Sequence, residues 1–306
     1  MAMEQAEAMS SDASSTASTA STASTDASDA AGPNASNGSA KRVLLTGATG
    51  YIAGQLLPGF RERYDLRLVD IAPAPGVEVV DLLETPVEEL APLFEGVDVV
   101  VHTAYQRPTG ADSQARYDTE RRNVDLMQRV YQLAVDHGVP RVVAASTNQA
   151  AKWYEQPYFQ GRRDRVTPED YPRPDSFYGW AKAAYESLGF LYACGSLGRA
   201  LEVIQLRIVV PREIDPELFV DQPAHRYVRE LAGYISERDL RQLFVKSIET
   251  PDIADEYGVP FHIFYGVSDN ARKFWSITNA REVIGYQPQD DSERRFAADI
   301  ARLLHG

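Results

Sequence analysis

A short apolar run and the glycine-rich segment directly after it constrain the fold of this chain more than any other feature. Residues 43–45 are Val-Leu-Leu, and residues 46–54 read Thr-Gly-Ala-Thr-Gly-Tyr-Ile-Ala-Gly. Glycine at such a turn lets the backbone approach a phosphate group, and the N-terminus of the following helix stabilises the phosphate charge. The segment therefore predicts a strand, a phosphate-binding turn and a helix, which together begin a dinucleotide-binding fold.

Apolar runs alternate with helical patterns over the residues that follow. The expected strands cover residues 43–46, 66–69, 77–80, 97–102, 142–145 and 201–208, and the expected helices end near 63 or cover 115–137 and 174–197. This alternation predicts an α/β fold with a Rossmann-like, doubly wound parallel sheet. It ends after Pro211, so residues 211–290 are expected to form mainly a small C-terminal substrate-binding part. Within that part, we expect residues 212–235 and 250–290 to be irregular with short helices.

The first forty residues differ in composition from the rest of the chain. Ser, Thr and Ala dominate there, and Lys, Arg, Ile, Leu, Val and aromatic residues are absent from this stretch. Such a segment cannot bury enough apolar surface to offset the entropy lost on ordering. We therefore expect a disordered tail over residues 1–40 and a single domain over 41–306, with the cofactor-binding core at about 41–210.

Charge and composition argue against several kinds of partner. The formal net charge is −13, and the residues after the tail carry 31 basic and 39 acidic side chains, which argues against nucleic acid. No apolar run approaches the length of a membrane span. A lone Cys194 excludes an intramolecular disulfide and suits a cytoplasmic enzyme. The histidines lack the paired spacing of metal ligands, so no metal site is expected.

Several residues are candidate contacts for a nicotinamide dinucleotide. Asp70 lies 23 residues after Gly47 and ends an expected strand, where an acid hydrogen-bonds the adenosine ribose. An acid there would repel a 2′-phosphate, so NAD is expected rather than NADP. Asp70 can alternatively be a turn residue or a cap, and Asp81 with Leu82 either touches adenine or forms a turn. The candidate cofactor contacts are Gly47, Thr49, Gly50, Tyr51, Ile52, Asp70, Asp81, Leu82, Thr103, Ala104, Asn123, Tyr178 and Lys182.

Tyr178 and Lys182 form a second informative pattern, because residues four apart lie on one face of a helix. A free tyrosine titrates at about pH 10, and the positive charges of Lys182 and of nicotinamide would favour the phenolate. Thr147 follows the strand at residues 142–145, where its hydroxyl can contact a reacting oxygen and Tyr178. These three are the candidate catalytic residues. The alternative for Tyr178 is a half-buried helix aromatic.

Two further features have open interpretations. Residues 162–165, Arg-Arg-Asp-Arg, are either a solvated loop or a contact for a phosphate or carboxylate on the substrate. His102 is either a packed residue at a strand end or a ligand, and its isolation from other histidines favours packing.

These patterns resemble the extended short-chain dehydrogenase/reductase superfamily, also described as NAD-dependent epimerases and dehydratases. The resemblance covers residues 41–290 and is carried by the glycine turn, Asp70, Asn123, Thr147 and the motif Tyr178-Gly-Trp-Ala-Lys182. Residues 145–149, 173–179, 229–236 and 265–270 are similar to uronate dehydrogenases and to haloarchaeal NAD-dependent glucose-6-phosphate and pentose dehydrogenases.

The resemblance implies oxidation of a cyclic sugar at its anomeric carbon, giving a lactone. Tyr178 would take the hydroxyl proton while hydride passes to NAD. The implied substrate contacts are Thr147, Asn148, Gln149 and Arg229, with Arg229 gripping a substrate carboxylate. Thr147 and Gln149 stand where the relatives have Ser and His, so the sugar can differ from theirs, and anionic and neutral sugars both stay open. A homo-oligomer is expected.

Two alternatives to a sugar dehydrogenase remain at this point. A sugar-nucleotide epimerase or dehydratase on the same fold would keep NAD bound and recycle it. A non-catalytic, redox-sensing NAD-binding regulatory protein would need no catalytic residues, and the presence of Thr147, Tyr178 and Lys182 argues against it.

Overall fold

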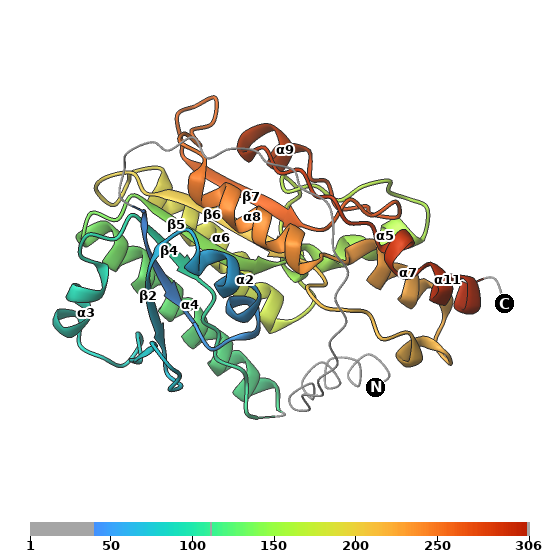
Figure 1. Ribbon diagram of the computed structural model, residues 1–306, viewed down its shortest axis with the longest axis horizontal. Helices are drawn as coiled ribbons and strands as arrows, with labels where there is room; N and C mark the ends of the chain where they lie inside the picture. The colour runs from blue at the N-terminus through green and yellow to red at the C-terminus, as the bar shows by residue number, and fades with distance from the viewer. Residues whose placement is uncertain (1–39, 111, 305–306) are drawn as a thin grey trace. The chain divides into compact units, whose positions relative to one another are not determined.

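Seven parallel strands form one sheet in the computed structural model, which describes residues 40–110 and 112–304 (Figure 1). The strand order is β3-β2-β1-β4-β5-β6-β7. The strands are β1 (Arg42–Thr46), β2 (Asp65–Asp70), β3 (Glu78–Val79), β4 (Val99–His102), β5 (Arg141–Thr147), β6 (Glu202–Ile208) and β7 (Phe261–Gly266). The tail predicted to be disordered lies outside the described residues, apart from Ala40.

Helices connect the strands and cover both faces of the sheet. The helices that pack against the faces of the sheet are α2 (Tyr51–Arg61), α3 (Val87–Phe94), α4 (Ser113–Asp136), α6 (Phe177–Ala193) and α8 (Glu237–Glu249). The other helices are η2 (Asn148–Tyr154), α5 (Glu155–Phe159), η3 (Pro216–Phe219), α7 (Ala224–Gly233), α9 (Thr278–Ile284), α10 (Ser292–Arg295) and α11 (Ala297–Leu304).

Two clusters of buried apolar side chains hold these layers together. One cluster packs α2 and α8 against the sheet, through residues such as Phe60 and Phe244, and the other packs α3, α4 and α6 against the opposite face, through residues such as Tyr131 (Figure 1). All four residues of β4 are buried, as expected for a central parallel strand covered on both faces. The prediction of a Rossmann-like parallel sheet is therefore confirmed.

The strand order changes direction beside β1. The chain moves outward from β1 to β2 and β3, and it then returns to place β4 on the other side of β1. In open parallel sheets a ligand binds at the carboxyl ends of the strands where the order reverses in this way. Thr46 and His102 pair at this edge and mark the crevice.

The expectation that residues 250–290 are irregular with short helices is wrong in one part. Residues 261–266 form β7, which pairs with β6 and extends the main sheet. Phe261, His262 and Ile263 are only half-buried because β7 is an edge strand. An edge strand does not need the continuous apolar run that identified the central strands. Part of the expected substrate-binding region therefore belongs to the cofactor-binding sheet.

Buried polar side chains fix the end of α7, which borders the site. Asn270 donates to the carbonyls of Ala232 (3.2 Å) and Tyr234 (2.7 Å), and the Ser292 hydroxyl donates to that of Leu231 (2.8 Å). Asn270 and Ser292 are fully buried, so these bonds satisfy carbonyls at the end of α7 that lack helical partners. This anchoring gives a structural role to Asn270, which ends the segment 265–270 that resembles the sugar dehydrogenases.

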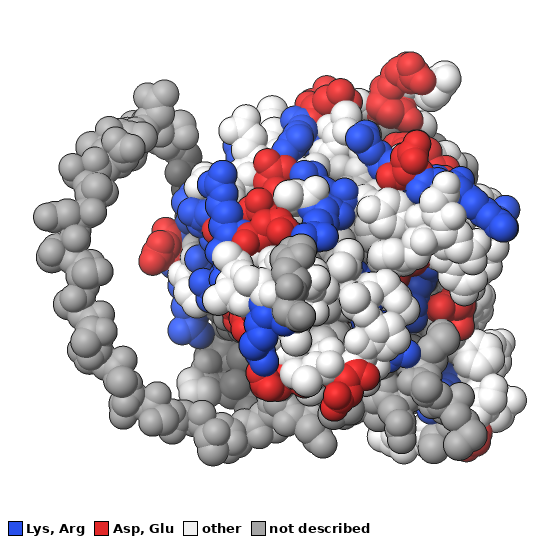
Figure 2. Space-filling model, turned by 90° about the vertical axis from the view of Figure 1, so that its right-hand side faces the viewer, with Lys and Arg blue, Asp and Glu red and all other residues white. Residues whose placement is uncertain are grey.

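Basic and acidic side chains are interspersed on the face that carries the C-terminal helices (Figure 2). Several of them form pairs between distant segments, such as Arg302 with Glu217 (2.7 Å) and Arg295 with Glu213 (3.0 Å). Among the described residues, no helix combines the length and the apolar character needed to cross a membrane.

Candidate active site

The glycine turn follows β1 in the geometry expected for a pyrophosphate cradle. Gly47 has a φ of +71°, and a Cβ atom there would lie 2.5 Å from the backbone nitrogen of Ala104. Gly50 is the N-cap residue of α2. The first turn of this fully described helix holds no acidic side chain. The positive end of α2 and its backbone N–H groups, at Tyr51 and Ile52, therefore suit a bound anion. The residues present fit the diphosphate of NAD.

Asp70 ends β2 beside this turn. One of its carboxylate oxygens accepts a hydrogen bond from the Thr49 N–H (2.9 Å), and the other accepts one from the Ala72 N–H (3.0 Å). Asp70 thus stabilises the turn, as one of its two sequence interpretations expected. Its place at the carboxyl edge of β2 also suits the ribose contact of the other interpretation.

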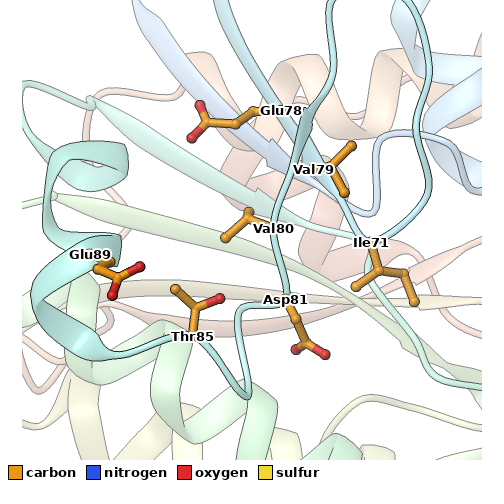
Figure 3. A pocket seen from close by; sticks show the side chains of 7 residues that line it. All are labelled: Ile71, Glu78, Val79, Val80, Asp81, Thr85 and Glu89. Atoms are coloured by element: carbon orange, nitrogen blue, oxygen red, sulfur yellow. The ribbon is translucent and has the colours of Figure 1, made fainter.

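A pocket of 560 Å³ is lined by Ile71, the residue that follows Asp70 in the chain (Figure 3). Asp81 lines it, and its carboxylate accepts hydrogen bonds from the N–H groups of Leu83 (2.9 Å) and Glu84 (3.2 Å), so it also forms a turn. Leu82 is buried in the apolar cluster that also contains Tyr131. The side chain of Leu82 therefore packs against the protein rather than lining this pocket, which is bounded by Ile71, Glu78, Val79, Val80, Asp81, Thr85 and Glu89.

The loop after β4 is held close to the glycine turn. The Thr103 hydroxyl donates to the carbonyl of Thr46 (2.8 Å). Asn123 of α4 is buried, and its amide accepts from the N–H of Gln106 and donates to its carbonyl, both at 2.9 Å. Asn123 therefore fixes the loop that carries Thr103 and Ala104 beside the turn.

The three candidate catalytic residues come together at the carboxyl edge of β5. The Lys182 ammonium donates to the carbonyl of Ala145 (2.8 Å), and the Tyr178 phenol lies close enough to Thr147, the last residue of β5, for the Thr147 hydroxyl to affect its pKa. Gly179 permits this approach, because a Cβ there would lie 2.4 Å from the carbonyl oxygen of Gln149. The start of α6 can therefore lie directly against η2.

Burial dominates the electrostatics of these groups. It raises the pKa of Tyr178 to about 12, although the Thr147 hydroxyl and the charge of Arg107 act in the opposite direction. Burial also lowers the pKa of Lys182 to about 8, and the carboxylates of Glu120 and Glu186 partly offset this effect. The protein alone thus holds the phenol protonated near neutrality, and an added positive charge beside it would lower its pKa.

A buried acid on α4, Glu120, lies near the candidate catalytic Tyr178 and was not found from the sequence. The Tyr105 hydroxyl donates to Glu120 (2.5 Å), and the Tyr105 ring packs edge-on against Tyr178 with centroids 5.2 Å apart. Glu120 is 1% exposed, and burial raises its pKa. Its spacing of three residues from Asn123 places both on one side of α4, which was the available signal.

A second buried acid, Glu186, lies one helical turn beyond Lys182. Arg207 of β6 donates to it from two nitrogens (2.8 and 2.7 Å), and the Ser146 hydroxyl donates to it at 2.9 Å. Arg207 also donates to the Tyr265 hydroxyl (2.9 Å). This network joins α6 to β5, β6 and β7 next to the candidate catalytic residues. The spacing of four from Lys182 was a signal that the sequence interpretation did not use.

Two of the four candidate substrate residues meet at one carboxylate, that of Glu155 at the start of α5. Asn148 donates to Glu155 (2.9 Å), and Arg229 of α7 donates to both of its oxygens at 3.1 Å. A further Arg229 nitrogen donates to Glu230 (2.8 Å). The structure therefore brings Asn148 and Arg229 together, and Glu155 is a site residue that the sequence interpretation missed. Gln149 accepts from Ser176, the N-cap residue of α6 (3.3 Å).

The arginine run at 162–165 is not uniformly solvated. Arg163 forms an ion pair with Asp170, and its guanidinium carbon lies 4.5 Å from the centre of the Tyr154 ring. His102 is fully buried and hydrogen-bonded to Thr46 (2.8 Å), in keeping with its interpretation as a packed residue. Within the part of the chain that the structure describes, no group of three or more His, Cys, Asp or Glu side chains is arranged to hold a metal ion.

Known proteins are similar to this chain in sequence and in fold. A model of the NAD dependent epimerase/dehydratase family matches residues 43–207. The chain is 33% identical over 270 residues to an NAD-dependent glucose-6-phosphate dehydrogenase of Haloferax volcanii, covering 82% of this chain and 94% of that protein. It is 28% identical over 260 residues to an L-arabinose 1-dehydrogenase (NAD(P)(+)) of the same organism, covering 82% and 97%. A solved structure of a mutated uronate dehydrogenase matches with a TM-score of 0.64 and 25% identity over 86% of each chain. The predicted family resemblance is thereby confirmed.

Proposed function

The chain belongs to the NAD dependent epimerase/dehydratase family, and from this premise we propose that it is an NAD-dependent sugar dehydrogenase. It would oxidise the anomeric carbon of an aldose, a uronate or a sugar phosphate to a lactone. The observation that carries the proposal is the convergence of Thr147, Tyr178 and Lys182 at the sheet edge that also holds the glycine turn. The relatives named above are a glucose-6-phosphate dehydrogenase, an arabinose dehydrogenase and a uronate dehydrogenase, which supports a sugar substrate.

The cofactor would be held by the turn and by acids near it. Gly47, Gly50 and the N-terminus of α2 would bind its diphosphate, and Asp70 would accept hydrogen bonds from the adenosine ribose. Bound there, NAD supplies the acceptor for a hydride. The same acid would disfavour a 2′-phosphate, so NAD is the expected cofactor rather than NADP.

The side chains of β5 and α6 would manage the proton. The Tyr178 phenolate would take the proton of the anomeric hydroxyl, a general-base role. Thr147 would hold the reacting oxygen against Tyr178. Lys182, fixed by the Ala145 carbonyl, would bind the nicotinamide ribose and lower the pKa of Tyr178 through its charge.

A panel of sugars tests this proposal. The purified protein is incubated with NAD and glucose, galactose, xylose, arabinose, glucuronate, galacturonate or glucose 6-phosphate, while the absorbance of the reduced cofactor is followed. Stoichiometric formation of reduced NAD with at least one sugar is the expected result. Failure of every sugar to give reduced NAD would reject the proposal, because an epimerase recycles its cofactor and a regulatory protein binds NAD without turnover.

We propose two further properties of the protein, its cellular location and its oligomeric state. We propose a cytoplasmic location, since the single Cys194 suits a reducing compartment. We also propose a homo-oligomer, which light scattering of the purified protein would test.

A further inference from the structure

We infer that Glu155 determines the sugars that this site accepts: by neutralising Arg229 it selects neutral aldoses over uronates and sugar phosphates. This inference rests on the proposed sugar dehydrogenase function and narrows it to one substrate class. It also changes the expected role of Arg229, which the family resemblance made the partner of a substrate carboxylate.

Glu155 occupies the part of Arg229 that would bind an anion. The Nε and one terminal nitrogen of Arg229 each donate to a different Glu155 oxygen at 3.1 Å. This is the two-bond geometry in which a guanidinium binds a carboxylate or phosphate. A substrate anion would have to displace Glu155 to make the same contact. Arg229 is 20% exposed and Glu155 is 12% exposed, so water screens the pair poorly.

The ion pairs that include Arg229 carry no net charge. The other terminal nitrogen of Arg229 donates to Glu230 (2.8 Å), and Glu230 in turn pairs with Arg212 (2.8 Å). Two cations thus alternate with two carboxylates. The pKa of Arg229 is lowered by burial, but the charges of Glu155 and Glu230 outweigh this and raise it, so Arg229 stays charged within the pairs. A third carboxylate would meet repulsion from both acids.

Glu155 also has the acceptor that a neutral sugar needs. Its Oε1 accepts from Asn148 and Arg229, while its Oε2 accepts from Arg229. A carboxylate oxygen can accept two hydrogen bonds, so Oε2 retains one acceptor position for a sugar hydroxyl. Asn148 directly follows the candidate catalytic Thr147 in the chain, which places this carboxylate one side chain away from the reacting group.

The experiment measures kcat/KM for glucose, xylose, glucuronate and glucose 6-phosphate with the parent, Glu155→Gln and Glu249→Gln. Glu249 forms a surface pair with Lys41, which precedes β1 and so lies at the opposite edge of the sheet from the site, and it provides a matched loss of one negative charge. We expect the parent to favour the neutral sugars by about tenfold or more, the scale of one uncompensated charge contact. Glu155→Gln should raise the anionic-to-neutral ratio by about tenfold, mainly through a lower KM for the anions, because it frees Arg229. Glu249→Gln should leave the ratio unchanged.

A parent protein that favours glucuronate or glucose 6-phosphate would overturn the inference, and this result needs no variant to fold. An unchanged ratio in a Glu155→Gln protein with the parent melting temperature would also overturn it. If the parent oxidises no sugar, the proposed function fails separately. Calorimetry with glucuronate then still decides the inference, which requires tighter binding to Glu155→Gln than to the parent.

Discussion

The cofactor side and the substrate side of this site are built in different ways. On the cofactor side, backbone approaches set the geometry: Gly47 lies against Ala104, and the α2 N-terminus follows from Gly50. On the substrate side, charged side chains set it, and Arg229 of α7 pairs with Glu155, which is 74 residues away in the sequence. A backbone approach tolerates little change, whereas an ion pair can be lost or gained by one substitution. The substrate side is therefore where members of one family can come to differ in the sugars they accept.

The largest effect should come from the group shared by both sides. Tyr178→Phe removes the phenol that we propose as the base, so turnover should fall by about 10²–10⁴-fold. NAD binding should persist, because the glycine turn is untouched, and fluorescence titration would verify this. Tyr171→Phe, at a position 77% exposed, controls for loss of a tyrosine hydroxyl. Near-normal turnover in Tyr178→Phe would remove this residue from the mechanism.

Gly47 tests whether close contact between backbone segments sets the geometry of the cofactor side. Gly47→Ala combines a φ of +71° with a Cβ 2.5 Å from the Ala104 nitrogen, so the free energy of unfolding should fall by about 1–3 kcal/mol and NAD binding should weaken. Gly54→Ala is the control, since its Cβ would meet no atom of the described chain within 4 Å. That change should be neutral or stabilise α2 by about 0.5–1 kcal/mol. Equal melting temperatures and NAD affinities for both variants would show that the close approach of Gly47 to Ala104 does not set the geometry of the cofactor side.

Cofactor choice should depend on charge rather than on the turn that Asp70 also supports. Asp70→Asn keeps an acceptor for the Thr49 N–H, which is 2.9 Å away, but removes the negative charge. The preference for NAD over NADP, measured as a ratio of kcat/KM values, should fall by about tenfold. Asp70→Ala removes both properties and should also lower the melting temperature. A parent enzyme that uses NAD and NADP equally would reject the assignment of Asp70.

The sequence predicted the cofactor side of the site better than the substrate side. The central strands and the glycine turn were predictable because apolar runs and glycines are local signals. β7 was missed because Phe261 and His262 are half-buried on an edge strand. Glu120 and Glu155 were missed because a buried acid looks like a surface acid until its distant partners, Tyr105 and Arg229, are known. The charge balance around Arg229 depends on tertiary contacts that no local pattern encodes.

The smallest expected effect concerns acid stability on the cofactor side, where His102 is buried beside the crevice. Burial and the nearby charge of Lys182 lower its pKa from 6.5 to about 3, and its Nδ1 is hydrogen-bonded to the Thr46 hydroxyl. Between these two pH values the unfolded chain binds the proton and the folded chain does not. The stability that His102 contributes is therefore fully present above pH 6.5 and is lost as the pH falls toward 3. Thr46, Tyr185 and Lys182 are the polar or charged groups near its ring, and of these Lys182 opposes a second positive charge.

His102→Asn retains a polar atom near Nδ1 but cannot take up this proton. Between about pH 7 and about pH 5.5 the parent should lose about 1 kcal/mol more of its free energy of unfolding than the variant does. Urea unfolding at each pH measures the difference in slope, which does not depend on how much the substitution destabilises the protein at neutral pH. The carboxylates of the chain titrate in both proteins and cancel in this difference. Parallel slopes would mean that His102 accepts a proton in the folded protein as readily as in the unfolded chain. The interior of the cofactor side would then tolerate a buried positive charge.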